Sequence, residues 1–312
     1  MRAPQRVPLD GLPPRVTVYE VGPRDGLQNE PAIVPTEVKA QFIARLAAAG
    51  LRVIEATSFV RPEWVPQLAD AEQLIGALET GSGTRYPVLV PNERGLDRAL
   101  GRGVRDIAIF GSATETFARR NLNRGIAESI AMFSPVVARA QAAGARVRAY
   151  VSMCFGDPWE GEVPIAQVVH VGTRLLELGC DELSLGDTIG VGTPGHVSAL
   201  LEAFAAAGVE PGRLAVHFHD TYGQALANTL TALRHGVTVV DAAAGGIGGC
   251  PYAESATGNL ATEDLVWMLH GLGIETGIDL AALVSTSAWM AGHLGRPSPS
   301  RVVQALAPKS QE

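Results

Sequence analysis

The sequence is poor in cysteine and has no long apolar run. Its three cysteines, Cys154, Cys180 and Cys250, are odd in number and widely spaced, which argues against a disulfide framework and indicates a reducing compartment. The chain has no run of about 18 apolar residues, and no signal-peptide core follows "MRAPQRVPLDGLPPRV". We therefore expect no membrane partner and a cytoplasmic location.

Basic residues are also scarce. The 312 residues carry a formal net charge of -7, and the one basic cluster is "RRNLNR" at 119–124. This balance argues against a nucleic acid or an anionic membrane surface as partner. An anionic small ligand that is held locally remains compatible with it.

Apolar residues make up 46% of the chain and alternate between two kinds of segment. Short β-branched runs are followed by Ala- and Leu-rich segments of helical period, such as 35–50, where Pro35 and Thr36 open a helix and Gly50 closes it. Eight such cycles predict strands at 15–22, 51–58, 85–92, 104–112, 145–153, 181–188, 213–221 and 237–246.

Strands separated by helices pair in parallel through right-handed crossovers, and eight units close a (β/α)8 TIM barrel of the α/β class. An open doubly wound sheet would also alternate, but usually with about five to seven strands. We predict one catalytic domain over 1–312, with the barrel at about 15–273 and a C-terminal helical extension at about 274–312. The extension is expected to pack across one end of the barrel or to form a subunit contact, and we expect a homodimer.

Active sites of such barrels gather at the carboxyl ends of the strands. The first strand ends in "EVGPRDGLQNE", which places Arg24 and Asp25 on the following loop, although "PRDG" is also typical of a type I surface turn. In "AVHFHDT", the period of two puts His217 and His219 on one face of a strand. One histidine alone would indicate a hydrogen-bonded core residue, whereas two beside a strand end favour a metal site.

Two imidazole nitrogens with oxygen ligands suit Mg²⁺, Mn²⁺ or Zn²⁺. Asp25 could supply one oxygen and Asn259, in "ATGNLATED", another, the alternative for Asn259 being a turn residue. Glu55 would be costly to bury unless it is paired, most simply with Arg24. Further polar groups on the same rim are Ser58 and Asp187.

Two other motifs carry less weight. "GVGTPG" at 190–195 matches a dinucleotide-binding pattern, but it follows the sixth strand and has Pro194 inside the helix start. A Ser-His-Asp hydrolase is excluded because the chain has no G-x-S-x-G elbow.

Five segments together resemble the metal-dependent 3-hydroxy-3-methylglutaryl-CoA (HMG-CoA) lyases, which are TIM barrels: "VGPRDGLQNE", "IEATSFV", "SLGDTIGVGTPG", "HFHDTYGQALAN" and "GGIGGCPYAESATGNLATEDLV". The resemblance runs from Val16 to "SRVVQALA" near the end. R-D-G-x-Q with H-x-H is shared with the isopropylmalate, citramalate and homocitrate synthases, whereas the glycine-cysteine loop is specific to the lyases.

The resemblance implies cleavage of HMG-CoA to acetyl-CoA and acetoacetate, as in leucine or ketone-body catabolism. It implies Mg²⁺ or Mn²⁺ held by Asp25, His217, His219 and Asn259, which would lower the pKa of the C3 hydroxyl. His217, Asp25 and a metal-bound water are alternative bases for that hydroxyl.

By the same resemblance Arg24 would neutralise the enolate oxygen and Glu55 would fix Arg24. Cys250 would exchange a proton with the acetyl-CoA carbon. A lid formed by the glycine-rich loop would deliver this thiol and exclude water.

Substrate contacts are expected from Gln28, Ser58 and Asp187. The CoA phosphates are assigned to Arg119, Arg120, Asn121 and Arg124, the alternative being a solvated charged face. Pro31 stands where family members often carry a lysine, and Cys154 inherits no role.

Three other functions remain open at this point. The substrate could be a longer branched 3-hydroxyglutaryl-CoA, such as the isohexenyl analogue. The enzyme could instead be a Claisen-condensing acyltransferase of the isopropylmalate or citramalate synthase type. A nucleotide-binding barrel without catalysis is the third alternative.

Overall fold

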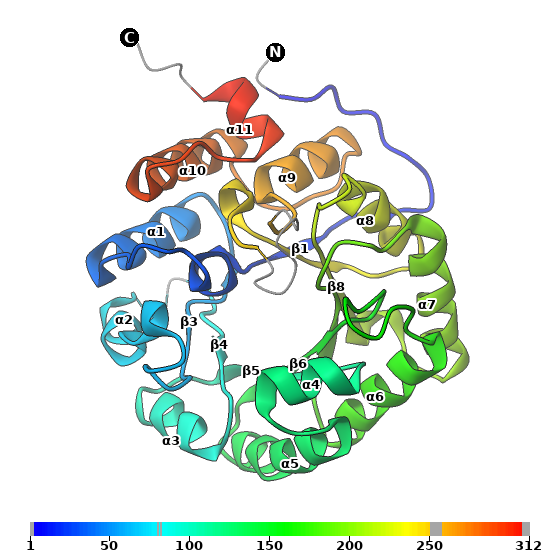
Figure 1. Cartoon of the computed structure of the whole chain (residues 1–312). Coiled ribbons are helices and arrows are strands. Elements are labelled where there is room, and N and C mark those ends of the chain that lie inside the picture. The colour runs from blue at the N-terminus through cyan, green and yellow to red at the C-terminus, as the bar shows by residue number, and fades with distance from the viewer. Residues whose placement is uncertain (1–2, 80, 82, 250–257, 308–312) are drawn as a thin grey trace.

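The strands run parallel around a ring, and the helices pack outside it (Figure 1). The computed structural model describes residues 3–79, 81, 83–249 and 258–307. The strands are β1 (Thr17–Glu20), β2 (Val53–Ile54), β3 (Thr57–Ser58), β4 (Val88–Leu89), β5 (Asp106–Ser112), β6 (Arg146–Ser152), β7 (Glu182–Asp187), β8 (Leu214–Phe218) and β9 (Val239–Ala242).

The sheet order β2-β1-β9-β8-β7-β6-β5-β4-β3 begins and ends within one predicted strand, 51–58. β2 pairs with β1 through Tyr19 and Val53, and β3 pairs with β4 through Thr57 and Val88. The strand is interrupted at Glu55, where its side chain enters the barrel. Since the two halves continue one another, the ring closes, and the predicted TIM-barrel fold is confirmed.

The helices follow the strands in the expected alternation. They are α1 (Thr36–Ala48), α2 (Ala71–Ala77), α3 (Glu93–Gly101), α4 (Glu115–Leu122), α5 (Ile126–Ala142), α6 (Ile165–Glu177), α7 (Pro194–Ala206), α8 (Ala225–Arg234), α9 (Thr262–Gly271), α10 (Leu280–Leu294) and α11 (Arg301–Leu306). α1 starts after Pro35 and is followed by Gly50 at φ +102°, where a Cβ would lie 2.2 Å from the carbonyl oxygen of Gly277. The predicted helix at 35–50 is confirmed, and only glycine fits its end.

Helix α4 is an addition that the alternation did not predict, because β5 is followed by two helices, α4 and α5. The basic cluster at 119–124 therefore lies on a helix and the turn that ends it, in which Asn123 is left-handed (φ 54°). Consecutive residues on a helix point about 100° apart, so Arg119 and Arg120 project from α4 in different directions.

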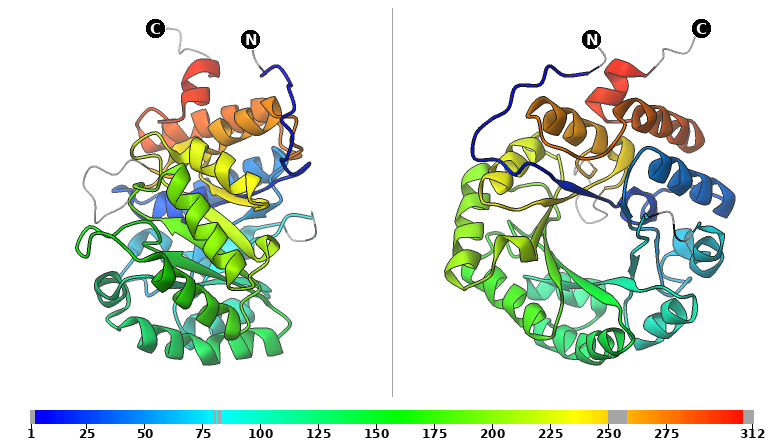
Figure 2. Two further views of the ribbon diagram at one scale, coloured as in Figure 1. Left: turned by 90° about the vertical axis from the view of Figure 1, so that its right-hand side faces the viewer. Right: turned by 180° about the vertical axis from the view of Figure 1, so that it is seen from behind.

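The C-terminal helices lie outside the ring. α10 contacts α1 and α9, and α11 contacts α9 and α10 (Figure 1). The segment ahead of β1 runs past α9, where Val7 N donates to the Gly271 carbonyl at 2.7 Å (Figure 2). The division into a barrel and an extension stays a prediction. No helix in the described part of the chain is long and apolar enough to cross a membrane.

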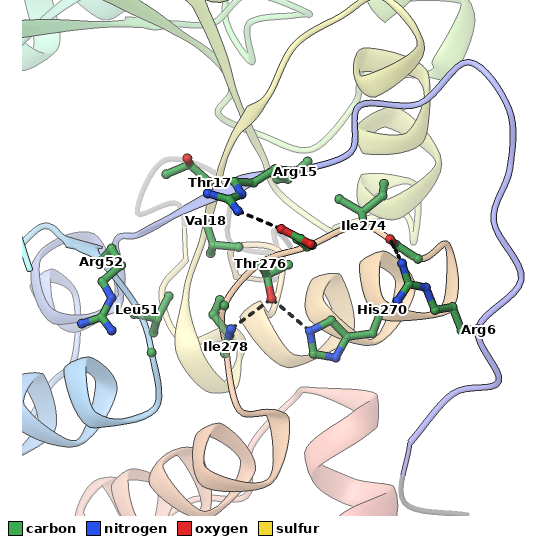
Figure 3. A pocket seen from close by; sticks show the side chains of 15 residues that line it. Arg6, Arg15, Thr17, Val18, Leu51, Arg52, His270, Ile274, Thr276 and Ile278 are labelled. Atoms are coloured by element: carbon green, nitrogen blue, oxygen red, sulfur yellow. Dashed lines mark hydrogen bonds and ion pairs between the residues drawn. The ribbon is translucent and has the colours of Figure 1, made fainter.

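A cavity of about 740 Å³ lies at the amino ends of the strands (Figure 3). Its three arginines do not converge on one point. Arg15 pairs with Glu275 at 2.8 Å, Arg6 donates to the Gly273 carbonyl at 3.0 Å, and Arg52 lies apart from both. Arg6 and Arg15 therefore hold the N-terminal segment against the β1 end of the barrel. In this fold the active site is expected at the other end, where the strands have their carboxyl ends.

Candidate active site

A second cavity, of about 480 Å³, opens at the carboxyl ends of the strands. Residues from the β1 loop, the β8 end and α4 line it together. Of the residues predicted for the site, those that line this cavity are Arg24, Asp25, Gln28, Ser58, Arg120, Asn121, His217 and His219. The structure thus brings residues up to 195 positions apart in the sequence to one cavity, at the end that the barrel fold favours.

The loop after β1 turns Arg24 into the barrel. Gly22–Gly26 forms one π-helical turn rather than a surface turn, and Arg24 is only 6% exposed. A Cβ on Gly22 would lie 2.5 Å from Oε1 of Glu20, and one on Gly26 would lie 2.6 Å from Cγ1 of Ile247. The two glycines let the turn pack this closely, which explains the spacing of "GPRDG".

The guanidinium of Arg24 is held on two sides. Its Nε donates to Oε2 of Glu55 at 2.7 Å, and its Nη1 donates to Oδ1 of Asp25 at 2.8 Å. The hydroxyl of Tyr150 donates to the same Glu55 oxygen at 3.1 Å, and the Tyr150 ring centroid lies 5.4 Å from the guanidinium carbon. The predicted pairing of Glu55 with Arg24 is confirmed.

Burial and the neighbouring charges act in opposite directions on these groups. Burial raises the pKa of Glu55, and the Arg24 charge and hydrogen bond offset part of that rise. Burial opposes the charge of Arg24, yet Glu55 and Asp25 raise its pKa above the usual range. Arg24 is therefore a permanent cation beside the cavity.

Asp25, His217 and His219 form a possible metal site, since ligand atoms of the three lie within 4.8 Å of one another. The two imidazoles come from β8 and the residue after it, with ring centroids 5.4 Å apart, as the period of two predicts. Asn259 pairs with His219 across a β-bridge, and its Nδ2 donates to Oδ2 of Asp25 at 2.9 Å.

The donor set fits a divalent cation. Within the described ranges, Nδ1 of His219 and Oδ1 of Asn259 are buried and have no hydrogen-bond partner, which is costly for polar atoms unless a ligand satisfies them. Burial, with a smaller contribution from His217, lowers the pKa of His219 to about 4. Although burial opposes ionisation, the Arg24 charge and the two histidines lower the pKa of Asp25 to about 2. A neutral imidazole and an ionised carboxylate are the forms that bind metals.

Two residues of the site were missed from the sequence. Asp241 on β9 lies 3.2 Å from Nδ1 of His217, and burial opposes its ionisation while Arg148 lowers its pKa. Tyr150 on β6 holds Glu55, as described above. The sequence carried a signal for both residues, because alternation turns each of them inward. Asp241 is in addition the one charged residue of "VTVVDAAAGG".

Other predicted residues are placed elsewhere. The carboxylate of Asp187 accepts from the backbone amides of Val191 (2.9 Å) and Gly192 (3.0 Å) and does not line the cavity, and burial raises its pKa to about 6. Arg119 and Arg124 lie on a separate cavity at the end of α4, whereas Arg120 and Asn121 face the site. Cys250 lies outside the described residues.

Residues 15–290 match the family model described as HMGL-like. The chain belongs to the HMGL-like family. A rat relative named cytoplasmic 3-hydroxy-3-methylglutaryl-CoA lyase is 50% identical, over 95% of this chain and 86% of its own length. A rat relative named mitochondrial hydroxymethylglutaryl-CoA lyase is 52% identical, over 98% of this chain and 94% of its own length.

Solved structures agree with these relatives. The HMG-CoA lyase of Bacillus subtilis matches with a TM-score of 0.93 and 46% identity, over 97% of this chain and 100% of that chain. An HMG-CoA lyase of Acinetobacter baumannii, solved in complex with coenzyme A and 3-methylmalate, matches with a TM-score of 0.90 and 35% identity, over 98% and 99%. The resemblance predicted from the motifs is confirmed over nearly the whole chain.

Proposed function

We propose that this protein is a carbon-carbon lyase that cleaves HMG-CoA to acetyl-CoA and acetoacetate. The observation that carries the proposal is the 2.8 Å contact between Arg24 Nη1 and Asp25 Oδ1. This contact supports the proposal because it sets a permanent cation beside the candidate metal ligands. Cleavage needs such a cation, since negative charge moves from the C3 oxygen to the thioester. The relatives at about 50% identity are named as lyases of this substrate.

Asp25, His217, His219 and Asn259 are the residues that would hold a divalent cation, Mg²⁺ or Mn²⁺. When bound, the cation would act as a Lewis acid that holds the hydroxyl and carboxylate oxygens of the substrate and lowers the pKa of the hydroxyl. The unpartnered oxygen of Asn259 and the ionised Asp25 support this assignment.

Cleavage breaks the C2–C3 bond of the substrate. The C3 oxygen gives its proton to a base, for which His217 and Asp25 are the candidates, and becomes the ketone of acetoacetate. The bonding electrons move to C2 and form the thioester enolate. Arg24, held by Glu55, would neutralise the enolate oxygen. The thiol of Cys250 would donate a proton to C2 and complete acetyl-CoA.

The CoA part of the substrate needs a local cation, since the chain has a net charge of -7. Arg120 and Asn121 line the cavity and would contact it. The guanidinium carbon of Arg120 lies 4.4 Å from the ring centroid of Trp159, which limits its freedom at the rim. Gln28 is half-buried and Ser58 is buried, and both line the same cavity, so they would contact the acyl part.

One assay tests both the substrate and the metal. Incubation with HMG-CoA and Mg²⁺ should yield acetoacetate, EDTA should abolish the product, and added Mn²⁺ should restore it. His219→Ala should lose turnover, whereas His235→Ala, at the C-cap of α8 where the ring contacts Ser198 Oγ at 2.8 Å, should keep it. No acetoacetate from HMG-CoA would contradict the substrate, and turnover that is insensitive to chelator would contradict the metal.

Two alternative activities are not favoured by the comparisons: a lyase for a longer branched 3-hydroxyglutaryl-CoA, and a condensing synthase. The same assay with a series of 3-hydroxyglutaryl-CoA analogues separates them. The rat relatives include a cytoplasmic and a mitochondrial protein, so a cytoplasmic location remains a proposal for this chain, as does the homodimer.

A further inference from the structure

The carboxylate of Asp241 is surrounded by donors from three neighbouring strands. Its Oδ1 accepts from Nη2 of Arg148 on β6 at 2.6 Å. Its Oδ2 accepts from Oγ of Ser184 on β7 at 2.9 Å and lies 3.2 Å from Nδ1 of His217 on β8. Asp241 is 1% exposed, so these contacts, rather than water, set its orientation.

Arg148 is itself fixed inside the barrel. Its guanidinium carbon lies 3.8 Å from the ring centroid of Tyr19 and 4.9 Å from that of Tyr150. Its Nε lies 3.3 Å from Oε1 of Glu182, a second buried carboxylate. Two carboxylates therefore face one buried arginine, and only Asp241 also reaches a histidine of the candidate metal cluster.

The two oxygens of Asp241 contact different groups, Oδ1 contacting Arg148 and Oδ2 contacting His217. Arg148 can only donate, so Oδ1 is committed to it, and Oδ2 is left as an acceptor toward Nδ1 of His217. A histidine that donates Nδ1–H keeps its lone pair on Nε2. The ring nitrogen on the far side from Asp241 is then the one free to bind a metal beside Asp25 and His219.

We infer that Asp241, aligned by Arg148 and Ser184, is a positioning residue that fixes the ring orientation and the Nδ1–H tautomer of His217 for metal binding. The inference rests on the metal site of the proposed function. His219 has no equivalent: in the part of the chain that the structure describes, its Nδ1 has no hydrogen-bond partner. The two histidines therefore differ in the support of their rings, and it is His217 whose ring is held in place for metal binding.

Asp241→Asn is the informative substitution. The carboxamide oxygen would be drawn to Arg148, which cannot accept a hydrogen bond, and the amide NH₂ would turn to His217. Nδ1 would then have to accept and the proton would move to Nε2, the tautomer that cannot bind the metal, a logic known from serine-protease triads. Removal of such a partner typically weakens metal affinity about 10- to 100-fold.

The test is Mn²⁺ affinity of the metal-free full-length protein, measured by isothermal titration calorimetry. D241N should bind Mn²⁺ about 10- to 100-fold more weakly than the parent. The matched control is E182Q, which removes the other carboxylate of Arg148 without touching His217, and it should bind like the parent. In ¹⁵N spectra of histidine-labelled metal-free protein at alkaline pH, the D241N variant should lose the Nδ1–H tautomer of His217.

Three outcomes separate the possible explanations. Parent-like Mn²⁺ affinity of D241N overturns the inference, and so does a loss in E182Q as large as that in D241N. Failure of the parent itself to bind Mn²⁺ contradicts the proposed metal site instead. If D241N does not fold, R148M/D241L replaces the buried pair with apolar side chains, and it should bind Mn²⁺ at least about tenfold more weakly. Parent-like affinity of that variant overturns the inference equally.

Discussion

The Nε of Arg24 and Oε2 of Glu55 lie 2.7 Å apart in a buried ion pair. The pair joins the loop after β1 to the break between β2 and β3, so it holds at a set place on the rim the cation that we propose neutralises the enolate. A buried cation that is held in this way needs no reorganisation when charge develops beside it.

Glu55→Gln should therefore lower kcat about 100-fold with little change in the KM for HMG-CoA, because Arg24 loses its charged partner. Tyr150→Phe is the matched control, since it removes only the second hydrogen bond to Glu55 (3.1 Å) and should cost about fivefold in kcat. Steady-state kinetics measures both. Equal losses in the two variants would mean that the Glu55 charge is not the feature that holds Arg24.

Arg120→Met should raise the KM for the CoA ester about tenfold, because a charge-assisted contact with a CoA phosphate is lost. Arg119→Met should leave KM unchanged, since Arg119 pairs with Glu115 at 3.5 Å and lies on a different cavity. Both residues are arginines on α4, so the comparison controls for net charge. A similar rise in both variants would indicate general electrostatic attraction instead of a contact.

Cys250→Ser should lower kcat by at least about 100-fold with little change in substrate binding, because a hydroxyl is a much weaker acid than a thiol. Cys154→Ala is the control. The Cys154 thiol donates to the Val151 carbonyl at 3.0 Å, and burial raises its pKa beyond the range of acid-base catalysis. Near-normal turnover of the Cys250→Ser variant would refute the acid-base assignment.

The buried carboxylates Glu20 and Glu263 predict a pH-dependent stability. Burial raises the pKa of Glu20 to about 7 and that of Glu263 to about 8. Between the ordinary glutamate pKa and these values the two groups bind more protons in the folded protein than in the unfolded chain, so their contribution to stability is fully present near pH 5 and is lost as pH rises toward 8.

Glu263→Gln should flatten this dependence, because the amide keeps the hydrogen bonds to Gly245 and Ser287 without a titrating proton. Thermal unfolding measured between pH 5 and pH 8 checks it: the Tm of the parent should fall more steeply than that of the variant. Glu177→Gln, at an exposed ion pair with Arg174, is the control and should follow the parent. Parallel curves for all three proteins would contradict the prediction.

Local patterns in the sequence were enough for the barrel and for part of the site. The alternation of strand and helix predicts the parallel ring, and the period of two in "AVHFHDT" places His217 and His219 on one face. The motif "GPRDG" also predicts local geometry, because its two glycines allow a turn in which a Cβ atom would clash with neighbouring atoms. The division of the predicted strand 51–58 into β2 and β3 at Glu55 could not be predicted, since nothing in "LRVIEATS" breaks the strand pattern.

What the sequence by itself determined is the set of elements and which side of each element a side chain occupies, since both depend on backbone geometry over a few residues. Only the tertiary structure decided which side chains meet. Asp241 reaches His217 because β8 and β9 pair in that register, and Arg120 is separated from Arg119 by the orientation of α4 on the barrel. The pairing of two strands and the orientation of a helix depend on packing between segments far apart in the chain, so the pattern of one segment fixes the face of a side chain but not its partner.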